Sequence, residues 1–190
     1  MRLADKASMT ATEFLTWQET QAGDQRHELL SGEAIAMAPE RNRHNLVKTA
    51  CHRALEDGVR AAGLDCTVLG DGASVVVSDN DVYEPDALVQ CGAPIDLDAT
   101  TVPTPTILVE VLSPSTSGVD AGGKLFGYFQ LPSVEHYLII DPVKRVIIHH
   151  ARAGSGVETA LLREGIVRLN PPGIEFSVVS CFTTLGEERA

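Results

Sequence analysis

The alternation of apolar and polar positions predicts two neighbouring strands, each with an acidic residue set into it. Val82–Val89 contains Asp86, and Ile107–Leu112 contains Glu110. A buried carboxylate is costly unless it is paired or binds a cation. If the two strands lie side by side, Asp86 and Glu110 meet at one edge of the sheet, where two carboxylates and water suit Mg²⁺. The pattern therefore predicts a magnesium site.

The N-terminal part is expected to form a short helix and a hairpin. Thr10, with Glu13 three residues later, has the spacing of a capping box for a helix over Met9–Trp17. Arg26–Met37 has the pattern of two strands that turn at Ser31-Gly32. Residues 1–8 are polar and are expected to form a frayed tail.

The longest helical pattern covers Asn42–Ala62 and ends at Gly63. Its apolar positions at helical spacing are Leu46, Ala50, Ala54 and Val59. The helix and the residue just before it carry the basic residues and histidines Arg41, Arg43, His44, Lys48, His52, Arg53 and Arg60. This charge has two equally open interpretations, a surface that faces phosphates or a solvated outer face. His44 stands in the first turn, where the helix dipole favours the neutral imidazole.

The second half predicts an α+β fold with a mixed central sheet flanked by helices. Strands are expected near residues 66–77, 82–90 and 106–112, followed by a helix over Asp120–Leu131 and a central strand over His136–Ile140. With the long helix before them, these elements give an αβββαβ core to which the N-terminal helix and hairpin are added. A long loop over 92–105 is expected to be mobile or to cover another part of the molecule.

A further hairpin is predicted within residues 143–163, outside this core. Its apolar positions are Val146, Ile147 and Ile148. Such an addition covers a sheet edge or forms one side of a two-fold contact, so we expect a homodimer.

Composition narrows the class of protein. The 190 residues suit one domain over 1–190, and an apolar content of 44% can fill one core. The net charge of −11 argues against a general nucleic-acid coat protein, which would be basic. It does not argue against an enzyme with a carboxylate-lined metal site and a local basic patch.

Cysteine spacing and hydropathy predict a cytoplasmic protein with reduced cysteines. Cys51, Cys66, Cys91 and Cys181 form no CxxC pair, so a structural zinc site is not expected. The first ten residues lack the apolar segment of a signal peptide, and no apolar run is long enough to span a bilayer.

Several short motifs carry a resemblance to a known family through their order and spacing. They are His27–Glu33, His44, Glu84–Asp86, Leu108–Thr116, Asp120 with Lys124 and Tyr128, and Val134–Pro142. The arrangement resembles the PD-(D/E)xK nuclease superfamily, and more closely the Uma-two family of restriction-endonuclease-like proteins. The resemblance extends over about residues 9–185.

The resemblance implies that Asp86 and Glu110 bind the metal and that Glu28 completes its shell, directly or through water. The lysine of the superfamily motif would lie on the same strand face as Glu110, two residues later. This chain has Leu112 at that position. Lys124, on the following helix, is the expected substitute, because a helix beside the strand can return an ammonium to the same place.

The resemblance also implies supporting roles for Glu28, His44 and Tyr128. Taken alone, Glu28 would be an exposed charge at a strand end. His44 could hold a carboxylate or a substrate phosphate. Tyr128 could donate to Glu110 or to the scissile phosphate, although packing and capping of the helix are the favoured roles for Tyr128 and Asp120.

Two functions of different classes remain open. The first is a Mg²⁺- or Mn²⁺-dependent endonuclease that hydrolyses DNA with a metal-activated water, using Asp86, Glu110 and Lys124. The alternative is a catalytically weak or inactive nuclease fold that acts as a dimeric binding or regulatory protein. Retention of a costly acid cluster favours the enzyme. Binding heat for a divalent metal would distinguish the two, because a binding module need show none.

Overall fold

The computed structural model describes residues 8–113, except 22 and 24, and residues 121–185. The expectations for residues 1–7, for the motif residues 114–116 and for Asp120 fall outside these ranges. The described helices and strands are α1 (Ala11–Glu19), β1 (His27–Leu30), β2 (Glu33–Ala36), α2 (Asn42–Ala62), β3 (Cys66–Gly70), β4 (Val75–Ser78), β5 (Asp81–Tyr83), β6 (Ala87–Cys91), β7 (Ile107–Val111), α3 (Ala121–Gln130), β8 (His136–Asp141), β9 (Val146–Ala153), β10 (Gly156–Leu162), β11 (Ile166–Leu169), β12 (Ile174–Ser177) and the 3₁₀ helix η1 (Val178–Leu185).

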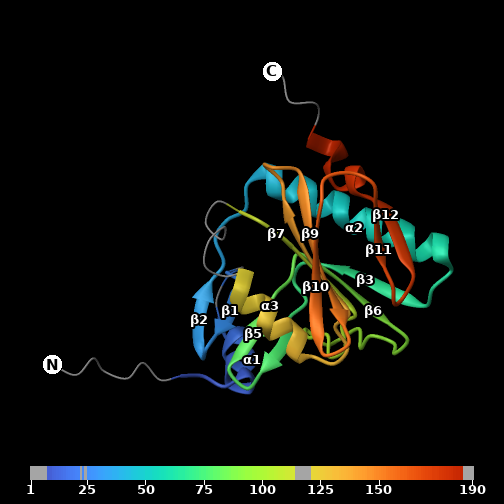
Figure 1. The fold of residues 1–190 in the computed structure, drawn as a ribbon. Coiled ribbons are helices and arrows are strands. Elements are labelled where there is room, and N and C mark those ends of the chain that lie inside the picture. The colour runs from blue at the N-terminus through green and yellow to red at the C-terminus, as the bar shows by residue number, and fades with distance from the viewer. Residues whose placement is uncertain (1–7, 22, 24, 114–120, 186–190) are drawn as a thin grey trace.

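A six-stranded mixed sheet forms the centre of the fold, in the order β10-β9-β8-β7-β6-β3 (Figure 1). The pair β7–β8 is parallel and its other neighbours are antiparallel. Helix α2, strands β3, β6 and β7, helix α3 and strand β8 follow one another as the predicted αβββαβ core. The predicted fold class is therefore confirmed, and the hairpin β9–β10 extends the same sheet.

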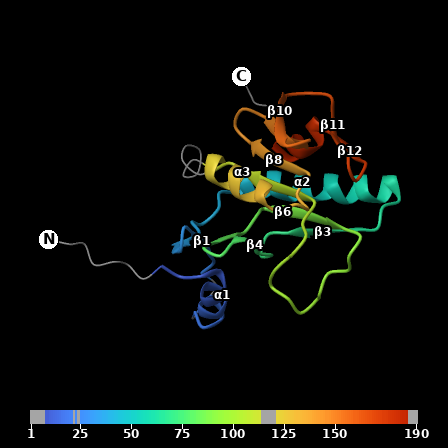
Figure 2. The same ribbon diagram turned by 60° about the horizontal axis from the view of Figure 1, so that its bottom comes forward.

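A second sheet, in the order β2-β1-β5-β4, lies beside the first and next to α1 (Figure 2). The two regions predicted as single strands near residues 66–77 and 82–90 are each divided between the sheets, because β4 and β5 leave the central sheet. Gly72, at φ 98°, turns the chain out of the central sheet after β3. The chain returns through Glu84–Asp86, where Pro85 cannot donate to a ladder. The Pro-Asp motif therefore stands at the crossing between two sheets.

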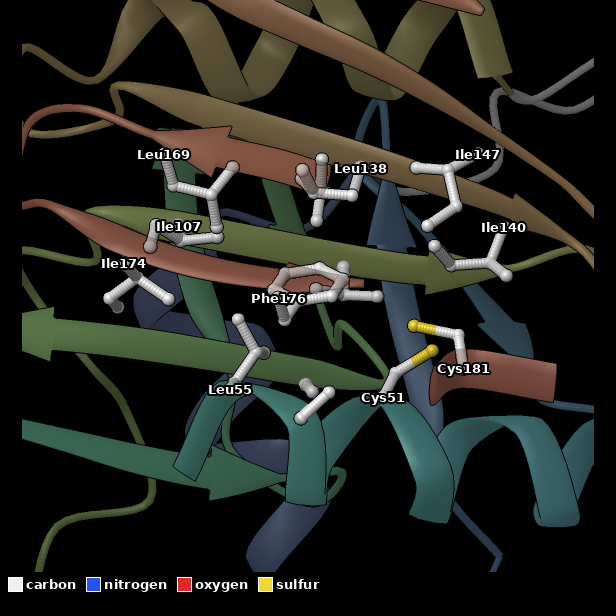
Figure 3. Packing of buried hydrophobic residues seen from close by; sticks show 14 of the residues in the cluster. Cys51, Leu55, Ile107, Leu138, Ile140, Ile147, Leu169, Ile174, Phe176 and Cys181 are labelled. Atoms are coloured by element: carbon white, nitrogen blue, oxygen red, sulfur yellow. The ribbon is translucent and has the colours of Figure 1, made fainter. Parts of the chain in front are cut away.

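Helix α2 covers one face of the central sheet, with β12 and η1 packed against it (Figure 3). The predicted bounds of α2 are confirmed, and Gly63 ends it in the left-handed conformation. Leu46 was expected in the core but is 43% exposed. The other three predicted positions, Ala50, Ala54 and Val59, are buried, and Val47, Cys51 and Leu55 widen the buried face. Strand β11 was not predicted, although its alternating burial marks a half-covered strand.

Helix α3 packs against the opposite face, where Tyr128 and Tyr137 are buried together. Gly127 allows this close approach: a Cβ at this position would lie 2.8 Å from Tyr83 Cε2. Along β7, Leu108 contributes to this layer while Val109 contributes to the α2 layer, as strand alternation requires. The side chains of β7 therefore divide between two apolar layers.

The cysteines differ from the reduced set that was expected. Cys66 and Cys91 form a disulfide between directly paired positions of β3 and β6. The expectation of a reduced thiol is wrong for these two, since a cross-strand pair places the sulfurs together. Cys51 and Cys181 are free, buried and turned toward each other (Figure 3). Among the described residues, no helix is long and apolar enough to cross a membrane.

Candidate metal and phosphate site

Asp86 and Glu110 are brought together by the pairing of β6 with β7. Ala87 pairs with Val109, which places Asp86, just before β6, at the level of Glu110. Asp86 Oδ2 accepts a 2.6 Å hydrogen bond from the Val111 amide. The adjacency of the two acid-bearing strands, expected from the sequence, is therefore confirmed.

Lys124 and Tyr128 reach Glu110 from the first and second turns of α3. The Lys124 ammonium donates to Glu110 Oε1 at 3.0 Å, and the Tyr128 hydroxyl donates to the same oxygen at 2.8 Å. Both residues are buried, at 7% and 0% exposed. Their i, i+4 spacing puts them on one face of the helix, and this face is turned toward the end of β7.

Glu28 joins the cluster from β1 in the second sheet. Its Oε1 accepts from Lys124 Nζ at 2.8 Å and from the Glu84 amide at 2.7 Å. Glu28 is only 8% exposed, so the interpretation of Glu28 alone as an exposed charge at a strand end is wrong. A carboxylate buried this deeply needs partners. Lys124 and the crossing segment supply them.

The charges around Glu110 conflict. Burial, together with the charges of Asp86 and Glu28, raises the pKa of Glu110 to about 7, and Lys124 opposes the rise. Burial and the Glu110 charge also raise the pKa of Tyr128 well above its ordinary value, so its hydroxyl stays a donor. The Lys124 ammonium, which is bonded to Glu28 and Glu110, does not cancel this repulsion, and a cation bound beside the carboxylates would relieve it.

Each of the three carboxylates presents one oxygen for a cation. Among the described residues, Glu28 Oε2, Glu110 Oε2 and Asp86 Oδ1 accept no hydrogen bond. Hard oxygen donors of this kind suit Mg²⁺, which binds through one or two carboxylates and keeps several waters. Glu28 and Glu110 are turned toward Lys124 and do not gather with Asp86 into a compact three-ligand group.

His44 approaches Asp86 from the first turn of α2. Its Nε2 lies 2.9 Å from the Val111 carbonyl oxygen and 3.3 Å from Asp86 Oδ2. Burial lowers the pKa of His44, but the hydrogen bond and charge of Asp86 and the charge of Glu40 outweigh it, and the pKa is raised. The expectation that the helix dipole keeps His44 neutral is therefore wrong in direction, because nearby carboxylates dominate.

A network of charges that the sequence did not reveal surrounds these residues. Lys48 Nζ lies 2.5 Å from Glu40 Oε2, 2.9 Å from Asp71 Oδ2 and 3.9 Å from Asp86 Oδ1. Arg26 pairs with Glu84 and Asp71. Lys48 lies four residues after His44 on α2, and Glu40 lies four residues before His44, just ahead of the helix, so this spacing could have identified them. Glu84 stands in one of the motifs of the family resemblance but was given no role there, and Asp71 and Arg26 carried no signal.

The basic residues of the α2 region have different roles in the structure. His44 and Lys48 turn inward to the acids, while Arg60 pairs with Asp57 on the surface. Arg41 and Arg43 are exposed and line a hollow of about 490 Å³. Its other lining residues are His44, Leu112, Ser113, Asp141, Pro142, Val143 and Lys144. Part of the basic surface thus opens beside the acidic cluster.

The sequence comparisons agree with this arrangement. A sequence profile of the Uma2 family, described as "Putative restriction endonuclease", matches residues 11–179. The chain belongs to the Uma2 family. Two uncharacterized relatives of this Uma2 chain come from Synechocystis sp.: slr1290 is 30% identical over 70% of this chain and 68% of its own length, and sll1609 is 27% identical over 81% and 86%.

A crystal structure from Anabaena variabilis has a similar fold. It is described as that of "a putative nuclease belonging to DUF820". The TM-score is 0.73 over 93% of this chain and 99% of that chain, at 17% identity. At this identity the match establishes the fold that this Uma2 family member shares with that protein.

Proposed function

We propose that this Uma2 family member is an endonuclease that hydrolyses DNA phosphodiester bonds with a divalent cation, Mg²⁺ or Mn²⁺. The observation that carries the proposal is the meeting of Asp86, Glu110 and Lys124 at one end of β6 and β7, with Lys124 Nζ 3.0 Å from Glu110 Oε1. The family and fold matches support the same class of reaction.

Asp86 and Glu110 would hold the cation, with Glu28 completing its shell directly or through water. A bound divalent cation lowers the pKa of its water and neutralises charge on phosphate oxygens. Lys124 would orient the attacking water or stabilise charge that develops on the phosphate. Glu28 would fix the Lys124 ammonium, to which it is bonded at 2.8 Å.

The remaining site residues position these groups. The Tyr128 hydroxyl holds Glu110 Oε1, which leaves the second oxygen of Glu110 directed elsewhere. His44 holds Asp86 from the α2 side or contacts a substrate phosphate. Arg41, Arg43 and Lys144 would bind the phosphate backbone where the hollow opens at His44. Local positive charge of this kind lets a protein of net charge −11 bind an anionic polymer.

Cleavage of supercoiled, linear and single-stranded DNA, with Mg²⁺ or Mn²⁺ and with a chelator, tests the proposal. The parent should cleave at least one substrate when metal is present, whereas Asp86→Asn and Glu110→Gln should cleave none. Calorimetry with the same metals tests the competing role. Metal binding without cleavage of any substrate would contradict the nuclease and favour a regulatory module.

We also propose that the protein forms a homodimer through β10. Within the described chain, β10 is an edge strand that pairs only with β9. Leu161 on β10 is 59% exposed, and Phe126 and Val157 line a small apolar hollow beside it. A second copy could continue the sheet across a two-fold axis and cover these side chains. Sedimentation should show a dimer at micromolar concentration, and a monomer would contradict this assembly.

A further inference from the structure

One ring nitrogen of His44 is buried without a hydrogen-bond partner. His44 is only 7% exposed, and its Nδ1 is bonded to no atom of the described residues. The nearest charged atom is Glu40 Oε2, at 3.3 Å and outside hydrogen-bond geometry. A buried polar atom in this position is unusual enough to require an explanation.

The hydrogen bond of the other ring nitrogen, Nε2, shows whether Nδ1 carries a proton or a lone pair. The Val111 carbonyl oxygen, 2.9 Å from Nε2, can only accept, so Nε2 carries the proton. In the neutral ring, Nδ1 then presents a lone pair toward a carboxylate oxygen. Two acceptors that face each other in a buried place repel unless a cation lies between them.

Asp86 supplies a third ligand at the same place. One ligand atom each from Glu40, His44 and Asp86 lies within 4.8 Å of the others. A metal-binding histidine commonly donates its second N–H to a backbone carbonyl, and Val111 already accepts that bond from His44. The orienting contact of a metal site is therefore already formed.

We propose that Glu40, His44 and Asp86 form a second divalent-cation site, which prefers Mn²⁺ or Zn²⁺ to Mg²⁺. An imidazole nitrogen is a poor ligand for Mg²⁺ and a good one for these transition-series ions. This site shares Asp86 with the cation site proposed above at Asp86 and Glu110. It rests on the proposed function only through that shared residue. It makes Asp86 a bridge between two cations of different chemistry.

Lys48 occupies the neighbourhood of the proposed cation. Its ammonium lies 2.5 Å from Glu40 Oε2, 2.9 Å from Asp71 Oδ2 and 3.9 Å from Asp86 Oδ1. A cation that binds Glu40 and Asp86 would displace the ammonium toward Asp71. Glu40, Lys48 and Asp71 all line a hollow of about 610 Å³, which gives ions a route to the site.

The competing occupant of Nδ1 is a proton. In an imidazolium, Nδ1 would carry a proton beside the Glu40 carboxylate and have no lone pair for a metal. The two accounts differ in one observable: a metal site places an imidazole nitrogen in the first coordination shell, whereas an imidazolium excludes it.

Pulsed electron paramagnetic resonance of bound Mn²⁺ decides between them, because a coordinated imidazole gives ¹⁴N modulation. The whole protein should show this modulation with Mn²⁺, and an excess of Mg²⁺ should not remove it. His44→Gln should abolish the modulation and weaken Mn²⁺ at this position at least about tenfold. Glu40→Gln should weaken the same signal. Glu40 is more exposed than His44, so this substitution is less disruptive to folding.

Two further variants keep the test independent of the nuclease. Glu110→Gln should retain the modulation, because Glu110 is not a ligand of this site. His52→Ala is the matched control, since His52 lies on the same helix with Glu56 at i+4 and 3.7 Å away. Modulation that survives in His44→Gln but disappears in His52→Ala would overturn the proposal. So would its absence from the parent, whether or not the protein cleaves DNA.

Discussion

The ammonium of Lys124 lies 3.0 Å from Glu110 Oε1. Helix α3 therefore supplies the positive charge that the superfamily motif places on the strand, at the position where this chain has Leu112. We expect Lys124→Met to lower turnover about 100-fold or more, because one preorganised donor to the transition state is lost. Mg²⁺ affinity should be at least as high as in the parent, since the ammonium repels the cation and is not a ligand. Cleavage rates and metal titrations measure both effects.

A surface control separates this effect from a simple change of charge. Arg60→Ala also removes one positive charge, from an exposed side chain paired with Asp57. It should leave both turnover and metal affinity unchanged. Cleavage by Lys124→Met at the parent's rate would remove Lys124 from the chemistry and leave water activation to the metal.

The position of α3 depends on a glycine behind Lys124. A Cβ at Gly127 would lie 2.8 Å from Tyr83 Cε2 and 3.0 Å from Val77 Cγ1, so Gly127→Ala must push the helix away from the second sheet. We expect a loss of about 1–3 kcal/mol in the free energy of unfolding. We also expect lower turnover, because Lys124 moves with the helix.

Gly123→Ala, on the same helix, is the matched substitution. A Cβ there meets nothing within 4 Å. Alanine should therefore raise the free energy of unfolding by up to about 1 kcal/mol, through helix propensity alone. Denaturant unfolding and cleavage assays compare the pair. Equal behaviour of the two variants would show that the close approach to Tyr83 does not position α3.

The sequence predicted the central sheet and the acids but not how the charges are balanced. Strand alternation located Asp86 and Glu110, and the helical pattern that ends at Gly63 gave the bounds of α2, because both are local signals. Burial of Glu28 and the crossing at Glu84 depend on a second sheet, which forms only when distant segments pair. A disulfide partner or an ion-pair partner likewise depends on the tertiary fold, and spacing along the chain does not specify it.

The raised pKa of Glu110 predicts a stability that depends on pH. A carboxyl group with a pKa of about 7 when folded and about 4.5 when unfolded binds more protons in the folded state between those values. This contribution is fully present below about pH 4.5 and is lost as the pH rises through about 7. Metal-free parent should therefore lose stability relative to Glu110→Gln between pH 5 and pH 8.

The same proton competes with the cation. Below about pH 7, binding at Glu110 must release a proton, so apparent Mg²⁺ affinity should fall by up to about tenfold per pH unit. Thermal unfolding over this pH range, with and without Mg²⁺, measures both effects. A parent whose stability follows that of Glu110→Gln at every pH would show that Glu110 is ionised throughout.

The exposed arginines at the start of α2 should bind the DNA backbone without selecting a sequence. Arg41 and Arg43 line the hollow that opens at His44, whereas Arg53 and Arg60 are exposed further along the same helix. The double variant Arg41→Ala/Arg43→Ala should weaken DNA binding on every sequence. It should also reduce the slope of log affinity against log salt by about one for each lost phosphate contact.

Metal affinity should not change in that double variant, because within the described residues no ion pair joins Arg41 or Arg43 to Asp86, Glu110 or Glu28. The double variant Arg53→Ala/Arg60→Ala removes the same charge from the same helix and should retain the parent's salt slope. Salt titrations of DNA binding, with Ca²⁺ in place of Mg²⁺ to slow cleavage, give the comparison. Equal losses in the two double variants would mean that net charge alone governs binding, and the hollow at His44 would then have no special part in holding the substrate.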